Sequence, residues 1–408
     1  MTYEEAYSKL RVPGQEHLLR FFSELDKPGQ HSLLSQIDET DLSYLDAFKA
    51  KAEAARRGVI TPITAMRLPE IQSQEAAFRR TGIENAARGR LAAVLLAGGA
   101  GTRLGIPGPK GTCDIGITRP VYIFQRLIEN LLDSVREIGT ALHLFIMTSR
   151  ANDAATRAFF KEHNFFGYDP AYIHFFVQEM APAVDDCGKI LLSSPSSIAS
   201  SPNGNGGWFK SLAAAGYLDF MKEQGIEWLN VFAVDNVLQR ICDPVFFGAV
   251  LKSGLPAGAK VIPKNSPEEK VGVMCLEDGR PSVVEYYELN DEMRTQRTED
   301  GSYAYFYGVI LNYLFRAADL EKVMNESMPI HFAHKAVPYV SESGEQIRPS
   351  APNAWKFEFF IFDILHELSG CLPFEVLREK EFAPIKNPTG TDSVESAREL
   401  LKANGIAL

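Results

Sequence analysis

The sequence has few cysteines, and their spacing speaks against two ways of stabilising a fold. Five occur among the 408 residues: Cys113, Cys187, Cys242, Cys275 and Cys371. The number is odd, no two are close in sequence and none forms a C-x-x-C pair, so neither a disulfide framework nor a zinc site is predicted. Free thiols in a reducing compartment are the simplest interpretation.

Long hydrophobic runs are also missing. The chain begins MTYEEAYSKL, with early acidic residues and no apolar h-region, so no signal peptide is expected. The apolar stretch 357–365 is interrupted by Glu358 and Asp363. No run approaches the roughly 20 residues that a membrane-spanning helix needs. We therefore expect a cytoplasmic protein without a membrane partner.

An excess of positive charge is absent as well. Lysine and arginine number 42 against 52 aspartates and glutamates, which gives a formal charge of −10. A protein this acidic is not expected to bind nucleic acid, so an anionic ligand must be met by a local cationic site. The length suffices for two or three domains.

From residue 91 onward, apolar runs of strand length alternate with amphipathic segments. The runs are 91–96, 142–148, 173–177 and 228–234. Segments 121–138 and 152–164, which lie between them, have helical patterns. This alternation predicts βαβ units and a parallel sheet that is buried on both faces.

Two shorter stretches carry turn signals. Residues 271–276 and 282–287 flank the sequence Glu-Asp-Gly-Arg and predict a β-hairpin with Asp-Gly in its turn. Residues 193–207 read SSPSSIASSPNGNGG. That composition is typical of a mobile surface loop, and its length favours a flexible loop that contacts a ligand.

We expect three parts along the chain. Residues 1–88 form a helical region, because apolar residues recur there at helical spacing and 50–57 is rich in good helix formers. Residues 89–378 form an α/β domain, and 379–408 a short C-terminal segment that ends in a helix at 393–403.

The first apolar run is followed by glycines and two cations in LAGGAGTRLGIPGPKG. A dinucleotide fingerprint fails because Leu104 stands at the third glycine, and a P-loop fails because Lys110 follows Pro109. Successive glycine N–H groups can still form an anion nest, to which Arg103 and Lys110 add charge. A tight turn with solvated cations is the alternative, but it leaves so many glycines beside two cations unexplained.

That stretch resembles the signature L-A-G-G-x-G-T-R-L-G followed by P-K-G of UDP-sugar pyrophosphorylases. Further blocks resemble the family in the same order: FFVQEM, PNGNGG, VDN, VGVMC, VVEYYE, PNAWKFEFFIFD and VLREKEFAPIKN. The branch that the sequence most resembles is UDP-N-acetylhexosamine pyrophosphorylase. The resemblance implies a Rossmann-like, glycosyltransferase A-like nucleotidyltransferase domain, with helices on both faces of a mixed, mostly parallel sheet.

The family reaction converts UTP and a sugar 1-phosphate into a UDP-sugar and pyrophosphate. The sugar phosphate attacks the α-phosphorus in line, so the protein supplies positioning and charge rather than a nucleophile. The resemblance makes Arg103 and Lys110 the catalytic residues, which hold the triphosphate. The nucleotide-binding residues that it implies are Leu96, Ala97, Gly98, Gly99, Lys110, Gln178, Gly204, Asp235 and Lys356.

Two of these residues follow apolar strand runs. A carboxylate at the carboxyl end of a parallel strand faces the ligand crevice, so Asp235 is interpreted as a contact to Mg²⁺, the implied cofactor. A turn or N-cap role is about as common for a lone aspartate, and the resemblance favours the metal. Gln178 offers a donor and an acceptor that match O4 and N3–H of uracil. A strand-end glutamine without a ligand is the alternative.

The implied sugar-phosphate residues are Asn205, Gly272, Glu285, Tyr286 and Lys386. Glu285 and Tyr286 are expected on the second hairpin strand, where a solvated cross-strand pair is the alternative. Lys356 and Lys386 would otherwise be ordinary surface lysines, and Lys386 implies that the C-terminal segment folds back over the site.

The sequence departs from the family at three positions. Glu179 replaces a small residue, and Phe306 and Val309 stand where the family has asparagines beside the sugar. The sugar is therefore the open question. N-acetylglucosamine 1-phosphate is favoured, and glucose, galactose or a broad range is the runner-up. A nucleotide-sugar binding protein that has lost catalysis is a third hypothesis, which the presence of Arg103, Lys110 and Asp235 disfavours.

Overall fold

The computed structural model describes residues 1–50, 57–299, 301–324 and 328–408. The chain divides into two compact units. The smaller unit comprises Met1–Arg56, Glu179–Gly207 and Met328–Ile361, and the larger comprises Arg57–Gln178, Trp208–Ser327 and Phe362–Leu408. Both group separate stretches of chain, whereas the sequence suggested cuts at residues 88 and 378. Most of the segment 50–57, predicted as helical, lies outside the described residues.

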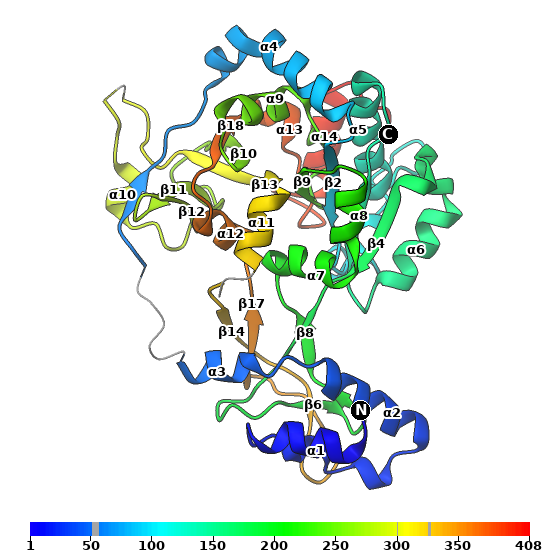
Figure 1. Ribbon diagram of the computed structural model, residues 1–408. Coiled ribbons are helices and arrows are strands. Elements are labelled where there is room, and N and C mark those ends of the chain that lie inside the picture. The colour runs from blue at the N-terminus through cyan, green and yellow to red at the C-terminus, as the bar shows by residue number, and fades with distance from the viewer. Residues whose placement is uncertain (51–56, 300, 325–327) are drawn as a thin grey trace. The chain divides into compact units, whose positions relative to one another are not determined.

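A ten-stranded mixed sheet forms the centre of the larger unit (Figure 1). Seven strands follow the order β1-β11-β13-β9-β2-β3-β4, while β10 pairs with β13 and β18, and β12 pairs with β11. The strands are β1 (Ile60–Pro62), β2 (Leu91–Leu96), β3 (Leu144–Thr148), β4 (Ile173–Val177), β9 (Trp228–Ala233), β10 (Ala257–Pro263), β11 (Val273–Glu277), β12 (Arg280–Val284), β13 (Tyr307–Arg316) and β18 (Leu372–Glu375).

The four strands predicted from apolar runs are neighbours in this sheet and run parallel. Strand β2 pairs in parallel with β3 and β9, and β3 pairs in parallel with β4. The predicted bounds of β2 and β4 are confirmed, β3 starts two residues late and β9 stops one residue early. All six residues of β2 are buried, as expected for a strand covered on both faces.

Helices cover both faces of the parallel part. On one face, α4, α5 and α9 share a hydrophobic core with Leu91, Ala93 and Leu95 of β2. On the other, Phe145 of β3 packs edge-on against Tyr217 of α8. The helices of the larger unit are α4 (Leu68–Ala86), α5 (Ile123–Ile138), α6 (Asp153–Glu162), α7 (Trp208–Ala214), α8 (Tyr217–Glu223), α9 (Pro244–Ser253), α10 (Asp291–Thr295), α11 (Ala317–Met324), α13 (Arg378–Glu381) and α14 (Val394–Ala403), and α12 (Ile361–Glu367) begins at the unit boundary.

The antiparallel part of the sheet contains the predicted hairpin. Strands β11 and β12 are joined by Asp278 and Gly279, whose φ angles of 49° and 78° are those of a type I′ turn. Strand β1 is a correction to the expectation that residues 1–88 are helical. Residues 60–62 pair antiparallel with residues 275–277 of β11, because this hairpin strand offers backbone groups with which they can form hydrogen bonds.

In its described residues, the smaller unit combines α-helices with short two-stranded sheets. Its helices are α1 (Tyr3–Arg11), α2 (Lys27–Glu39) and α3 (Ser43–Lys49), and its strand pairs are β5–β8, β6–β7, β14–β17 and β15–β16. These strands are β5 (Met180–Pro182), β6 (Leu192–Ser194), β7 (Ser197–Ile198), β8 (Ser200–Pro202), β14 (His331–Lys335), β15 (Tyr339–Val340), β16 (Gln346–Ile347) and β17 (Ala354–Glu358).

The stretch 193–207 is ordered, contrary to the prediction of a flexible loop. It contributes to β6, β7 and β8 and ends in a 3₁₀ turn at Asn205–Gly207. Backbone pairing of β8 with β5 supplies the order that the side chains do not indicate. Among the helices described, none is long and apolar enough to cross a membrane.

Candidate functional site

The glycine loop leaves the carboxyl end of β2 and folds into a compact double turn. It runs through the 3₁₀ turns Thr102–Leu104 and Lys110–Thr112 before α5 begins. The Gly101 N–H donates to Gly108 O at 2.7 Å, and the Lys110 N–H donates to Gly99 O at 3.3 Å. These bonds fold the loop back on itself, so that Lys110 returns to the end of β2.

The glycines of this loop serve different purposes. A Cβ on Gly101 would lie 2.1 Å from Ile106, and one on Gly111 would lie 2.3 Å from the Phe124 ring, so both are required by packing. Gly105 has a φ of 73°, in the left-handed region. A Cβ on Gly99 would meet no described atom within 4 Å. Gly99 is therefore a position where the backbone is open to approach by a ligand, as are Gly105 and Gly108.

Asn152 secures the start of the loop and was missed in the sequence. Its side-chain amide donates to Ala97 O at 3.0 Å and to Gly99 O at 3.4 Å, and its Oδ1 accepts the Ser149 N–H at 2.7 Å. The side chain is only 3% exposed. A buried asparagine that bonds backbone on both sides fixes the path of the loop. A lone Asn after a strand carries no signal of such a role.

Lys110 and Asp235 come together at the ends of the adjacent parallel strands β2 and β9. Their Nζ and Oδ2 atoms are 3.7 Å apart, and the side chains are 16% and 24% exposed. Burial lowers the pKa of the Lys110 amine, Asp235 opposes that effect, and the charges of Lys386 and Arg103 lower the pKa further. Lys386 and Arg103 thus act electrostatically on Lys110, with Arg103 on the exposed side of the loop.

Gln178 follows β4 and approaches the glycine loop from the other side. Its side chain is 5% exposed, and its Oε1 is 2.7 Å from where a Cβ on Gly98 would stand. Gln178 therefore lies beside Gly98 of the loop. Only a glycine at position 98 allows the amide to come this close.

The C-terminal segment lies against the strand end that carries Asp235. The Ile385 N–H donates to Asp235 O at 2.8 Å, and Lys386 is the residue that follows Ile385. The Lys386 amine forms an ion pair with Asp392 at 3.4 Å and is 44% exposed. The segment therefore lies against the chain that follows β9, and α14 confirms the predicted terminal helix.

Gly272 and Glu285 are brought together at the antiparallel side of the sheet. A Cβ on Gly272 would lie 3.4 Å from Glu285 Oε1. Burial raises the pKa of the Glu285 carboxyl, Glu288 raises it further, and Arg57 and Lys386 oppose them. Lys386 therefore acts electrostatically on both Glu285 and Lys110.

Glu285 and Tyr286 lie just beyond β12, which is a correction to their expected place on the strand. The strand ends at Val284 because a turn follows. The Glu288 carboxylate accepts the Glu285 N–H at 2.8 Å, and the Glu288 N–H donates to Glu285 O at 2.9 Å. The Tyr286 carbonyl accepts from Arg294 at 3.0 Å.

Phe306 and Val309 do not share one environment. Val309 lies on β13, whereas Phe306 precedes the strand, which begins at Tyr307. The Val309 N–H donates to Gly272 O at 2.9 Å, so Val309 adjoins Gly272. Phe306 instead stacks on Tyr303, with ring centroids 6.0 Å apart. Of the two departures, Val309 is the one that adjoins a candidate sugar residue, Gly272.

Gly204, Asn205 and Lys356 belong to the smaller unit. Gly204 has a φ of 87°, and a Cβ there would lie 2.3 Å from Phe359 O. Asn205 Oδ1 accepts the Ile361 N–H at 3.0 Å, and Lys356 lies on β17 opposite Ala333. Gly204 and Asn205 thus hold the chain that follows β17. The other candidate residues all belong to the larger unit.

A resident metal would need more protein ligands than this site offers. In the described part of the chain, no three His, Cys, Asp or Glu residues are grouped as metal ligands. Asp235 is a single, partly exposed carboxylate that is paired with a lysine. That donor set suits Mg²⁺ carried in by phosphates, because Mg²⁺ is commonly held by one or two carboxylates together with substrate oxygens.

Comparisons with known proteins agree on one family. Residues 46–404 match the family model described as UTP–glucose-1-phosphate uridylyltransferase. The human UDP-N-acetylhexosamine pyrophosphorylase-like protein 1 is 36% identical, and the match covers 98% of this chain and 83% of the human protein. The UDP-N-acetylglucosamine pyrophosphorylase of Saccharomyces cerevisiae is 33% identical, with 94% and 86% covered.

A solved structure extends this likeness to three dimensions. It is the uridine diphosphate N-acetylglucosamine pyrophosphorylase of Trypanosoma brucei in complex with an inhibitor. Its TM-score is 0.84 at 25% identity, and the match covers 98% of this chain and 84% of that one.

Proposed function

Since this chain belongs to the UDP-sugar pyrophosphorylase family, we propose that it makes UDP-N-acetylglucosamine and pyrophosphate from UTP and N-acetylglucosamine 1-phosphate. It is a uridylyltransferase, which is a kind of nucleotidyltransferase. The observation that carries the proposal is the Lys110–Asp235 pair beside an open glycine loop. A glycosyltransferase A-like classification and a cytoplasmic location belong to the proposal too.

The main chemical task is to bring two polyanions together. The Gly98–Gly99 backbone and Lys110 receive the triphosphate of UTP, and Arg103 adds charge from the exposed side of the loop. These donors are held before the reaction by Asn152 and by the loop's own hydrogen bonds. Fixed charge aimed at the transferred phosphoryl group and leaving pyrophosphate lowers the barrier.

Asp235 is the residue that would hold Mg²⁺. When bound, the ion would offset the repulsion between the phosphates. Asp235 itself orients the Lys110 amine. Lys386 acts on both Lys110 and Glu285. This arrangement fits a sugar phosphate whose phosphate lies near Lys386 and whose sugar lies near Glu285.

The sugar side of the proposal rests on Gly272, Glu285, Tyr286 and Val309. The Glu285 carboxylate can accept hydrogen bonds from sugar hydroxyls, and Val309 supplies an apolar wall that suits the methyl of an N-acetyl group. Asn205, Gly204 and Lys356 are proposed as ligand contacts from the smaller unit.

The test is a panel of sugar 1-phosphates with UTP and Mg²⁺, in which pyrophosphate release is measured. N-acetylglucosamine 1-phosphate is expected to give the highest kcat/KM. A higher value for glucose 1-phosphate would favour the runner-up, which is the activity that the family model's description names. Release with no sugar of the panel would contradict the proposed reaction.

We expect UTP to be preferred over ATP by a margin that depends on Gln178. A buried amide can pair with O4 and N3–H of uracil, whereas a purine presents a different pattern of donors and acceptors and a larger ring system. CTP exclusion should be weaker, since a flipped amide can adapt to cytosine. Gln178→Ala should lower kcat/KM for UTP about tenfold, the effect of roughly one buried hydrogen bond.

The matched control is Gln74→Ala, an exposed glutamine on α4. It should leave both nucleotides unaffected. Equal kcat/KM for UTP and ATP in the wild type would contradict the role of Gln178.

We also expect Val309→Asn to change sugar selectivity. An asparagine beside Gly272 would offer a donor and an acceptor where valine offers neither, and a site that pairs a polar group rejects sugars that leave it unpaired. Apolar discrimination is worth only roughly 1–3 kcal/mol, so the wild type should retain some activity with glucose 1-phosphate or N-acetylgalactosamine 1-phosphate.

The measurement is the ratio of kcat/KM for N-acetylglucosamine 1-phosphate to that for glucose 1-phosphate, in the wild type and in Val309→Asn. Phe306→Asn is the contrasting variant, because Phe306 precedes β13 and its ring stacks on Tyr303. A ratio that changes with Phe306 and not with Val309 would show that the sugar lies elsewhere.

A further inference from the structure

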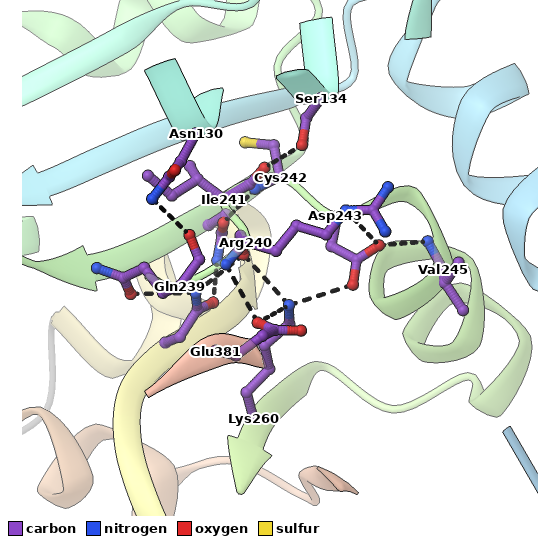
Figure 2. Close-up of polar contacts among 12 residues, drawn as sticks. Asn130, Ser134, Gln239, Arg240, Ile241, Cys242, Asp243, Val245, Lys260 and Glu381 are labelled. Carbon is purple, nitrogen blue, oxygen red and sulfur yellow. Dashed lines mark hydrogen bonds and ion pairs between the residues drawn. The ribbon is translucent and has the colours of Figure 1, made fainter. Parts of the chain in front are cut away.

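Behind the strand end that carries Asp235 lies a lysine with no solvent exposure. Lys260 is on β10, and its Nζ is 2.6 Å from Glu381 Oε2 and 3.1 Å from Asp243 Oδ2. It also donates to Arg240 O at 3.2 Å. Figure 2 shows the amine between these groups. All of them are contributed by the larger unit.

Stability alone does not account for this cluster. Removing charges from water is costly, and replacing a buried ion pair by uncharged side chains is often neutral or stabilising. Glu381 shows the cost, because burial raises the pKa of its carboxyl while Lys260 opposes that effect. A fully buried lysine between two carboxylates does, however, specify one arrangement of the segments that carry them.

Those segments are the ones that flank the candidate site. Glu381 is the last residue of α13, five residues before Lys386. Arg240 lies in the loop that follows Asp235, and its N–H donates to Glu381 Oε2 at 3.2 Å. Lys260 therefore joins the C-terminal segment to the loop after β9.

The C-terminal segment and the loop after β9 also meet along a line of backbone and side-chain hydrogen bonds. Asn236 donates from Nδ2 to Glu381 O at 2.7 Å and accepts the Ala383 N–H at 2.9 Å. The Val237 N–H donates to Ala383 O at 3.3 Å, and the Ile385 N–H donates to Asp235 O at 2.8 Å. This seam, formed by residues 235–237 and 381–385, sets the distance between Asp235 and Lys386.

The loop has a second set of supports that does not involve the C-terminal segment. From α5, Asn130 donates to Gln239 O at 3.1 Å and Ser134 donates to Ile241 O at 2.6 Å (Figure 2). Asn130 also donates to Val237 O at 3.1 Å. Loss of Lys260 would therefore leave the loop after β9 anchored to α5. Loss of Lys260 would instead loosen residues 381–385, which form the C-terminal side of the seam.

We propose that Lys260 is a positioning residue for uridylyl transfer, which holds α13 against the loop after β9 and so fixes Lys386 relative to Asp235. The inference rests on the proposed function, in which Lys386 contacts the sugar phosphate. Lys260 acts through Glu381 and the seam and does not touch the substrate. Its loss should impair use of the sugar phosphate more than use of UTP, because the glycine loop has its own supports.

The test compares Lys260→Met with the double variant Lys260→Met/Glu381→Gln. The single variant leaves the Glu381 carboxylate buried without a counter-cation, so its unfolding midpoint should fall. The double variant removes that charge and keeps an oxygen for the Arg240 N–H, so its midpoint should return toward the wild type. Lys252→Met, an exposed lysine on α9, is the matched control.

In the double variant we expect kcat/KM for N-acetylglucosamine 1-phosphate to fall at least about tenfold, with KM for UTP within about twofold of the wild type. Amide hydrogen exchange at Ala383 and Ile385 should accelerate, while exchange at Leu96 in β2 stays unchanged. A stable double variant with wild-type kinetics, or with unchanged exchange at Ala383 and Ile385, would overturn the inference.

The exchange measurement also separates this inference from the proposed function. If the wild type transfers uridylyl to no sugar phosphate, the proposed function fails. The role of Lys260 in holding the seam is then decided by exchange at Ala383 and Ile385 alone. If the single variant does not fold, the double variant still gives both readouts.

Discussion

Substitution of Lys110 by alanine is expected to lower kcat by about 10²–10³-fold, the usual cost of removing one preorganised charged donor from a transition state. The amine lies at the end of β2 within 3.7 Å of Asp235, in a loop fixed by its own hydrogen bonds. Nothing else in the loop can replace it at that point, since Arg103 is on the exposed side. Arg103→Ala should also abolish useful turnover.

The measurement is steady-state kcat and KM for both substrates, with circular dichroism and the unfolding midpoint to show that the fold is intact. Lys161→Ala, an exposed lysine on α6, is the control and should behave as the wild type. Near-normal kcat in both Lys110→Ala and Arg103→Ala would show that this loop is not the triphosphate site.

Chelation of divalent cations is expected to stop turnover, and Asp235→Asn should remain impaired by about 10²-fold or more even at high Mg²⁺. The described residues provide one carboxylate at this point rather than a cluster, so metal binding should depend on nucleotide as well as on Asp235. The amide is a weaker ligand, and it also leaves Lys110 without its counter-charge.

Two comparisons identify the cause of that loss. Mg²⁺ titration in the presence of UTP should show a weaker apparent affinity in Asp235→Asn than in the wild type. Asp219→Asn, an exposed carboxylate on α8, should titrate normally. Full activity in EDTA would show that the reaction does not require Mg²⁺. An unchanged Mg²⁺ titration in Asp235→Asn would show that Asp235 does not bind the ion.

The parallel half of the sheet could be predicted because its information is local. Strands buried on both faces are continuous apolar runs, and residues 91–96 and 173–177 carry no competing signal. The Asp-Gly turn is equally local, since only a few residues tolerate positive φ at both central positions. Strand β1 was missed because its three residues depend on the edge of β11 rather than on their own pattern.

The candidate site could be predicted where the residue types by themselves indicate the chemistry. Glycines followed by Arg103 and Lys110 indicate an anion, and Asp235 after an apolar run indicates a crevice at a strand end. Asn152 was missed, because an asparagine that bonds Ala97 and Gly99 is indistinguishable in sequence from one in a turn. Lys260 was missed for the same kind of reason: its two carboxylate partners lie 17 and 121 residues away.

The sequence by itself determined the ligand class and the strands that present it, because apolar runs, turn glycines and charged residues after strands act through their immediate neighbours. Only the tertiary structure decided which of those residues meet. It placed Val309 beside Gly272 and Phe306 beside Tyr303, ordered the stretch 193–207 through strand pairing, and buried Lys260 under the seam. These outcomes depend on contacts between distant segments, which are set by the packing of the whole sheet rather than by any local pattern.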